Sequence, residues 1–230
     1  MRLNIATMKM YFLTCNNPTR RAHFLNEFKG YDVTEVHPVT GIPKNESGTI
    51  GFSRMLDLGS RHQDRTKPFQ PFAIFEDDVK RSREIPESID IPDDADILYI
   101  GLSSWGCNKD GVATPNSVLY TNIDTYSIQV YNMCATHGLI VCSVHGLLAI
   151  QKCMLESYFV EKAWDISLSQ IHPYCNVYAL KQPLVYQYGP LGGYERETKI
   201  HYEDTCAHTY DPSMRNTTNV SIQMCNPQQF

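Results

Sequence analysis

The chain has 230 residues, of which 42% are hydrophobic and 20% are charged, and its formal net charge is -5 at pH 7. This composition predicts a globular protein with a substantial core. The net negative charge argues against a protein that binds the phosphates of nucleic acid, because such binding needs a basic surface. No apolar run approaches the roughly 18 residues that cross a bilayer, and the N-terminus lacks the apolar core of a signal peptide. We therefore expect a soluble, cytoplasmic protein without a membrane span.

The first half of the chain has a regular strand and helix pattern. Residues 9–15 predict a strand, and the following segment has the signals of a helix. Asn17 suits the N-cap, Pro18 suits the first helical position, and Gly30 suits the residue just past the end. Further expected elements are a strand over 32–40, a short helix over 52–58 between two glycines, and a buried strand over 72–75.

The second half continues the alternation of apolar strands and amphipathic helices. Expected strands cover 97–101, 137–142, 176–180 and 184–188, expected helices cover 143–162 and 163–172, and a hairpin or irregular insertion covers 118–130. Strands that alternate with helices predict an α/β fold with a mostly parallel central sheet flanked by helices. In such sheets ligands bind outside the carboxyl ends of the strands.

Three consecutive acids, Glu76, Asp77 and Asp78, follow the predicted strand at 72–75. Adjacent carboxylates repel one another, and burying them is costly unless a cation joins them. One interpretation is a solvated strand end that is neutralised by the basic side chains of Lys80, Arg81 and Arg83. The other is a site for a hard metal ion with oxygen ligands. If the strand continues through Asp78, Glu76 and Asp78 point to one side, with the spacing of a DxD-type motif that holds Mg²⁺ or Mn²⁺.

Cysteine and glycine patterns narrow the chemistry further. The eight cysteines lie in a long chain and their spacings match no small disulfide scaffold, so we expect no disulfide framework. They also include no CxxC pair, so we expect no structural zinc site. The chain also has no GxGxxG and no GxxxxGK[ST] segment, so a bound nucleotide would not be held by those loops.

Seven segments, read in chain order, resemble glycosyltransferase family 25, which includes lipopolysaccharide and collagen galactosyltransferases. They are "CNNPTRRAHF", "GTIGFSRMLDLG", "FAIFEDDV", "ADILYIG", "THGLIVCSVHGLLAI", "AWDISLSQ" and "PLVYQYG", and they cover about 15–189. The chain departs from the family pattern where "GFSRML" lacks a Ser-His pair and where "HGLIVCS" has leucine in place of an aromatic residue. The chain is also similar to glycosyltransferase domains of large algal DNA viruses, which build capsid-protein glycans.

The resemblance implies a GT-A-like, Rossmann-like single domain over 1–230. Within it, 1–105 would be the nucleotide-binding half, 106–190 the acceptor-side half and 191–230 an irregular C-terminal segment. The implied activity is hexosyl transfer from a UDP-sugar to a hydroxyl of a glycan or glycoprotein acceptor, with Mn²⁺ or Mg²⁺ as cofactor, in the host cytoplasm if the protein is viral. Two alternatives stay open: a metal-dependent phosphohydrolase, and a non-catalytic carbohydrate-binding domain on the same fold. Oligomeric state is not indicated.

The resemblance also implies roles for single residues. Metal ligands would be Asp78, Glu76 and His208, with Asp77 completing the diphosphate motif, and catalytic groups would be Asp165 as base and Asp78. Nucleotide contacts would come from Thr14, Asn16, Asn17, Arg20 and Arg21. Each role has a structural alternative: the arginine pair is also typical of a solvated helix face, Asp165 suits a helix N-cap, and a lone histidine is more often not a ligand.

Overall fold

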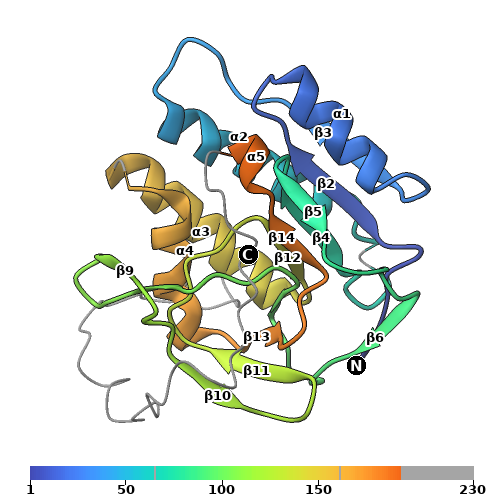
Figure 1. Cartoon of the computed structure of the whole chain (residues 1–230). Helices are drawn as coiled ribbons and strands as arrows, with labels where there is room; N and C mark the ends of the chain where they lie inside the picture. The colour runs from blue at the N-terminus through green and yellow to red at the C-terminus, as the bar shows by residue number, and fades with distance from the viewer. Residues whose placement is uncertain (65, 161, 193–230) are drawn as a thin grey trace.

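The structure is a computed structural model that describes residues 1–64, 66–160 and 162–192. Its centre is an eight-stranded sheet with the order β10-β11-β13-β7-β12-β4-β2-β3 (Figure 1). These strands are β2 (Lys9–Leu13), β3 (Val33–Val36), β4 (Phe72–Glu76), β7 (Ile97–Tyr99), β10 (Tyr120–Asn122), β11 (Ser127–Val130), β12 (Gly138–Val141) and β13 (Val177–Leu180). Three two-stranded pairs surround the sheet: β1 (Arg2–Asn4) with β6 (Ser88–Asp90), β5 (Val79–Arg81) with β14 (Val185–Gln187), and β8 (Trp105–Cys107) with β9 (Ala113–Pro115).

The central sheet is mixed, so the prediction of a mostly parallel sheet is wrong. Parallel pairing joins β2 to β3, β2 to β4 and β7 to β13, whereas β12 is antiparallel to both of its neighbours, β4 and β7. The pairs β10–β11 and β11–β13 are antiparallel as well. Because β12 is reversed, its first residue lies beside the last residues of β4 and β7. Residues that precede β12 therefore lie near the carboxyl ends of β4 and β7.

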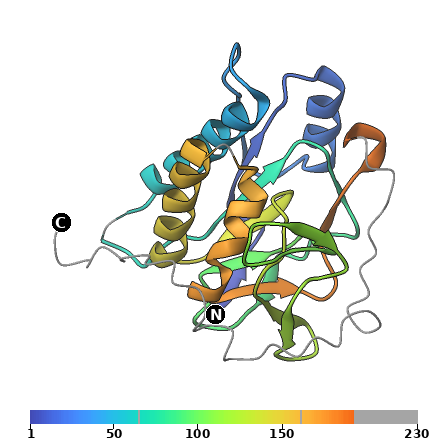
Figure 2. The ribbon, with the colours of Figure 1, turned by 90° about the vertical axis from the view of Figure 1, so that its left-hand side faces the viewer.

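Three helices cover one face of the sheet: α2 (Lys44–Arg61), α3 (Val144–Val160) and α4 (Trp164–Ile171) (Figure 2). Phe52 and Met55 of α2, Ile150 of α3 and Leu168 of α4 are fully buried in one apolar cluster with the alternate side chains of the strands. A short 3-10 helix, η1 (His172–Tyr174), links α4 to β13. No helix in the described ranges is long and apolar enough to cross a membrane.

Helix α1 (Pro18–Glu27) packs on the opposite face. Asn17 caps it by accepting hydrogen bonds from the backbone N–H groups of residues 19 and 20, and Pro18 is the first helical residue, as the sequence predicts. Phe24 stacks on Phe12 of β2 with ring centroids 4.2 Å apart and on Phe28 at 4.5 Å. This aromatic stack fixes the rotation of α1, and therefore the direction of every other side chain on the helix.

Helix α2 is longer than the short helix expected over 52–58, because Gly48 and Gly59, the two expected limits, both lie inside it. A Cβ on Gly48 would lie 2.3 Å from the ring of Trp164, and a Cβ on Gly59 would lie 2.3 Å from the ring of Phe72. These glycines let the helix approach α4 and β4 closely; they do not end it. The last described helix, α5 (Gly189–Gly192), is a single turn after β14. The predicted irregular segment at 191–230 otherwise lies outside the described residues.

The predicted halves, 1–105 and 106–190, interleave in one sheet, because β12 and β13 of the later half flank β7 of the earlier half.

Candidate functional site

The three acids lie at the carboxyl end of β4, where the chain turns into β5, and this segment is here called the acid turn. Strand β4 stops at Glu76, and Asp77 and Asp78 make the turn into β5. The expected alternation through Asp78 is therefore wrong, since the last two acids are not in the strand. Both aspartates are nearly inaccessible, with 1% and 3% of their surface exposed. Buried carboxylates of this kind need a cationic partner, so the interpretation as a solvated strand end is wrong too.

Arg20 is that cationic partner. Its Nη2 lies 2.6 Å from Asp78 Oδ2, and its Nε lies 2.8 Å from Asp77 Oδ1. The Nε–H is poorly aligned with the Asp77 oxygen, so that contact is an ion pair without a well-directed hydrogen bond. Arg20 lies four residues before Phe24 and hence on the same face of α1. The packing of Phe24 thereby directs the guanidinium toward the acid turn.

The two oxygens of Asp78 have different surroundings. Oδ2 receives both the Arg20 guanidinium and the side-chain amide of Gln187, whose Nε2 lies 3.1 Å away. Oδ1 is buried and has no hydrogen-bond partner among the described residues. The backbone is held as well, because the Tyr188 N–H donates to the Asp78 carbonyl at 2.7 Å. Asp78 is thus fixed through one oxygen, while the other remains bare.

Asp77 has no bare oxygen. Its Oδ2 accepts a hydrogen bond from the Cys15 backbone N–H at 2.7 Å, and its Oδ1 faces Arg20. Burial raises the pKa of Asp77, while the Cys15 N–H and the Arg20 charge oppose that rise. The contact with Cys15 ties the acid turn to the loop that follows β2, so Asp77 connects two neighbouring strand ends.

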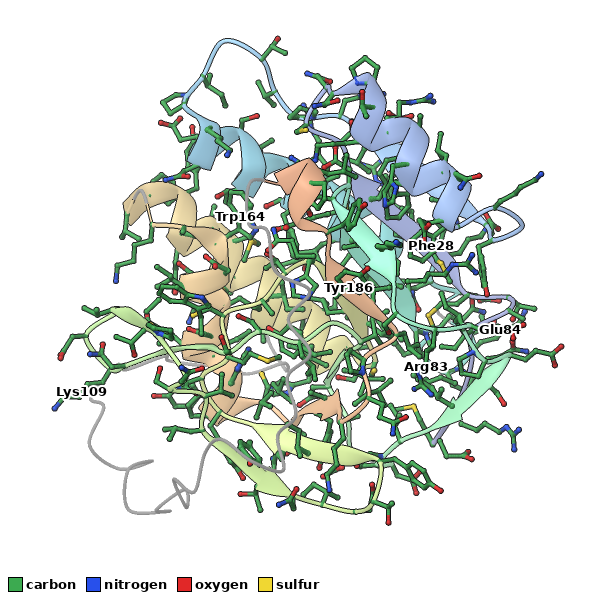
Figure 3. All side chains as sticks on the ribbon, viewed as in Figure 1. Phe28, Arg83, Glu84, Lys109, Trp164 and Tyr186 are labelled. Atoms are coloured by element: carbon green, nitrogen blue, oxygen red, sulfur yellow. The ribbon has the colours of Figure 1, made fainter. Side chains whose placement is uncertain are left out.

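Glu76 is oriented by a chain of two hydrogen bonds. Thr136 Oγ1 donates to Glu76 Oε1 at 2.6 Å, and the Trp164 indole N–H donates to Thr136 Oγ1 at 3.1 Å. The indole N–H can only donate, so Thr136 accepts from Trp164 and in turn donates its hydroxyl hydrogen bond to Glu76. Trp164 starts α4 (Figure 3) and fits against Gly48 of α2. The close contact of these two helices therefore determines where Glu76 points.

The environment of Glu76 favours its neutral form. Burial raises its pKa to about 8, the charge of Asp78 adds to the rise, and the Thr136 hydroxyl opposes it. Asp165, in the first turn of α4, lies close enough to contribute in the same direction. Burial also raises the pKa of Asp165, whose Oδ1 accepts the N–H of Ile166 at 2.8 Å. The structure thus brings Asp165 close to the acid turn at the carboxyl end of β4.

This shift predicts how stability depends on pH. Glu76 has a pKa of about 8 in the folded protein, against an ordinary value of 4.5, so between these values the native state holds a proton that the unfolded chain has released. Its contribution to the free energy of unfolding therefore falls as pH rises from about 4.5 to 8, by a few kcal/mol. We expect Glu76→Gln to remove that fall, measured by urea unfolding at several pH values. Glu84→Gln, at an exposed carboxylate, is the control, and an unchanged pH profile for Glu76→Gln would contradict the assignment.

His137 is a buried neighbour of the acid turn that the sequence did not single out. One ring nitrogen bonds to the Leu102 backbone, and Nε2 has no hydrogen-bond partner among the described residues. Burial lowers the pKa of His137 to about 4, although Asp78 opposes the change, so the ring is neutral at pH 7. A Cβ on Gly101 would lie 2.5 Å from Nε2. The glycine at the end of β7 therefore lets the imidazole sit over the backbone.

The remaining predicted nucleotide contacts are placed unevenly. Thr14 is buried at the end of β2, and Asn16 is exposed beside it with a φ of 60°. The side chain of Asn17 caps α1. Arg21 points away from the acids, and its Nε lies 2.8 Å from Glu35 Oε2 of β3. The predicted arginine pair is thus divided, with only Arg20 at the acid turn. His208 lies outside the described residues.

The basic residues after the acid turn do not neutralise it. Lys80 Nζ lies over the ring of Tyr188 at 4.9 Å, Arg81 pairs with Glu27 at 3.6 Å, and Arg83 donates to the Gln182 carbonyl. The neutralising charge comes from α1 instead. No sequence pattern near residue 76 indicates this, because Arg20 reaches the acids through the packing of α1 on the sheet.

Thr136 and Gln187 are the polar contacts of the acids that sequence reasoning missed. Gln187 ends β14, which pairs with β5 immediately after the acid turn. Thr136 comes just before β12, a strand whose reversed direction brings its first residue opposite Phe75. A threonine and a histidine directly before an apolar run were the only local signal, and they become informative only when the strand direction is known.

Two hollows in the described surface lie away from the acid turn. One, of about 420 Å³, is lined by Glu27, Arg81, Ser82, Arg83 and Glu84. The other, of about 490 Å³, lies near the start of β2 and includes Tyr11, His62 and Phe69. The candidate site therefore rests on the chemistry of the acids and their partners.

Comparisons with known proteins add little to this geometry. No known protein-family profile matches the chain, and no curated protein matches it. Among solved structures, the protein A197 from STIV matches with a TM-score of 0.44 and 12% sequence identity, covering 78% of this chain and 83% of that chain. A similarity this weak carries no argument about function.

Proposed function

We propose that this chain is a glycosyltransferase with a GT-A-like fold that uses a divalent cation, Mn²⁺ or Mg²⁺, and a UDP-sugar donor. The observation that carries the proposal is the bare, buried Oδ1 of Asp78. A carboxylate whose other oxygen is already held by Arg20 and Gln187 is prepared to receive a further cation. The donor class and the GT-A assignment rest on the sequence resemblance to glycosyltransferase family 25.

The donor atoms at the acid turn suit a hard cation. Asp78 offers Oδ1, and Glu76, once the cation displaces its proton to solvent, would offer the oxygen that Thr136 does not engage. Magnesium and manganese prefer such oxygen ligands and often bind through one or two carboxylates together with substrate phosphates. When bound, the cation would supply positive charge to the departing diphosphate. In the described part of the chain, the three acids do not place three ligand atoms within 4.8 Å of one another, so a cation here would need ligands from the substrate or from other residues.

Arg20 and Asp165 have separate roles in this proposal. Arg20 offsets part of the negative charge of Asp77 and Asp78 before substrate arrives, and its remaining guanidinium nitrogen would contact a phosphate oxygen. Asp165 would accept the proton of the acceptor hydroxyl, because burial raises its pKa toward the working range of a general base. The proposal leaves His208 as a further cation ligand from the sequence resemblance.

Thermal unfolding with UDP, GDP and ADP, each with and without Mn²⁺, tests the proposal. A ligand at about 100 times its dissociation constant adds about 2.7 kcal/mol, which in a chain of this size raises the unfolding midpoint by roughly 5 to 10 °C. We expect this rise only with UDP plus Mn²⁺. No rise with any pair would overturn the donor-site assignment. A phosphohydrolase would instead release phosphate from the nucleotide without an acceptor, and a carbohydrate-binding domain would respond to sugars without nucleotide.

A further inference from the structure

A second group of side chains that could bind a metal lies at the opposite end of the parallel strands, just before β7 begins. Asp96 immediately precedes β7, His145 is in the first turn of α3, and Cys175 follows η1. One ligand atom from each residue lies within 4.8 Å of those of the other two. The sequence gives no hint of this group, since the three residues are separated by about 30 positions or more. Only the fold brings an oxygen, a nitrogen and a sulfur ligand together.

The carboxylate of Asp96 is held in a fixed orientation. His145 Nδ1 lies 2.9 Å from Oδ2, and the Asn176 backbone N–H donates to the same oxygen at 2.9 Å. Oδ1 accepts the hydroxyl of Ser143, which in turn accepts the Gly146 N–H at the start of α3. A Cβ on Gly146 would lie 2.3 Å from the Asp96 carbonyl oxygen, so the helix start and the strand start are in direct contact.

We propose that Asp96, His145 and Cys175 form a binding site for a borderline-soft divalent cation, and that this cation is Zn²⁺. Imidazole and thiolate select zinc over the magnesium and manganese that oxygen ligands prefer. Three protein ligands with water in the fourth position make a common tetrahedral zinc site. The site is separate from the acid turn, because Asp96 precedes β7 at the amino ends of the parallel strands, whereas Asp78 follows β4 at their carboxyl ends.

The existing contacts must adjust to accept the ion. Zinc bonds of about 2.0 to 2.3 Å at tetrahedral angles separate ligand atoms by roughly 3.3 to 3.8 Å, so the His145–Asp96 distance of 2.9 Å must widen slightly. The ion would replace the proton between His145 Nδ1 and Asp96 Oδ2, while Ser143 and Asn176 keep their bonds to the carboxylate. Such outer contacts orient metal ligands. The side chain of His145 is 42% exposed, which gives water access to the fourth position.

Ion binding also requires the thiol of Cys175 to ionise. Burial, followed by the charge of Asp96, raises the pKa of this thiol to about 12, so the metal-free protein holds it protonated. The ion displaces that proton to solvent and binds the thiolate, with no oxidation or reduction. Without the ion, the hydrogen bonds of Asp96 to His145, Ser143 and the Asn176 N–H form only a junction between β7, α3 and the loop before β13.

Titration of chelator-treated protein with Co²⁺, a spectroscopic substitute for Zn²⁺, tests the site. Cys15→Ser serves as the background, because Cys15 is an exposed thiol of the described chain. We expect one Co²⁺ per chain to give thiolate-to-cobalt charge-transfer absorption and the visible bands of tetrahedral cobalt, both removed by Zn²⁺. Cys175→Ser should abolish the charge-transfer band. His145→Asn, at a half-exposed position, should weaken binding by more than about 10-fold.

Asp78→Asn, together with His145→Asn, separates this site from the proposed donor site. Asp78→Asn should leave the cobalt spectrum unchanged, and His145→Asn should leave any stabilisation by UDP plus Mn²⁺ unchanged. The zinc proposal is overturned if the charge-transfer band is absent, or if Cys175→Ser and His145→Asn bind Co²⁺ as the background protein does. Either result would identify the group as a hydrogen-bonded junction without affecting the donor-site proposal.

Discussion

Asp78→Asn is expected to abolish the stabilisation by UDP plus Mn²⁺, which the proposal puts at roughly 5 to 10 °C in the unmodified protein. The substitution preserves the shape of the side chain but removes the charge of the buried Oδ1, which has no partner among the described residues. An amide also presents an NH₂ group in one of the two oxygen positions. Transfer of sugar should fall by about 10²- to 10³-fold, the usual effect of removing one preorganised electrostatic group.

Asp77→Asn is the matched control for this experiment. Asp77 uses one oxygen for the Cys15 N–H and the other for Arg20, so it has no free oxygen for a cation. We expect this variant to unfold more easily, by about 1 to 3 kcal/mol, and to retain the metal-dependent rise with UDP. A full rise in Asp78→Asn, or its loss in Asp77→Asn alone, would contradict the assignment of Asp78 as the cation ligand.

Local sequence signals were sufficient for most elements of the fold. The buried strand at β4, the capped helix α1 and the long helix α3 lie within a few residues of their predicted bounds. Helix α2 was underestimated because a glycine in a helix has two explanations, a break or a close contact, and only the position of Trp164 decides between them. Strand direction was equally hidden, because the apolar run at β12 is compatible with either orientation.

The sequence names residues of the candidate site but not their contacts with one another. The acids at 76–78 are recognisable as a charged strand end, and the family resemblance singles out Arg20 and Asp165, but neither signal indicates which groups hold the acids. The partners that decide the chemistry come from distant segments: Arg20 through the stacking of Phe24, Thr136 through the reversal of β12, and Gln187 through the β5–β14 pair. These contacts depend on tertiary packing, which the residue pattern near the acids does not encode.

Arg20→Met is expected to lower the stability of the metal-free protein by about 3 kcal/mol. The variant leaves Asp77 and Asp78 buried without their cation, and removing one partner of a buried ion pair costs about 3 to 5 kcal/mol. The lower figure applies because the Arg20 side chain is 18% exposed. The unfolding midpoint should fall by roughly 6 to 12 °C. Arg21→Met is the control on the same helix, since Arg21 pairs with Glu35 at a half-exposed position and such pairs contribute about 0 to 1 kcal/mol.

The unfolding midpoint of Arg20→Met with Mn²⁺ alone then shows whether the acid turn binds a divalent cation or whether the Arg20 ion pair is only a structural contact. If the acid turn binds a divalent cation, Mn²⁺ supplies the positive charge that Arg20→Met has lost, so it should stabilise this variant more than the unmodified protein. UDP should add less in the variant, because the guanidinium is no longer available to the diphosphate. Equal stability of the Arg20 and Arg21 variants would show that the acids are neutralised in another way. If the Arg20 variant is destabilised and Mn²⁺ does not restore its stability, the ion pair serves only to stabilise the fold. The proposal that the acid turn binds a divalent cation would then be wrong.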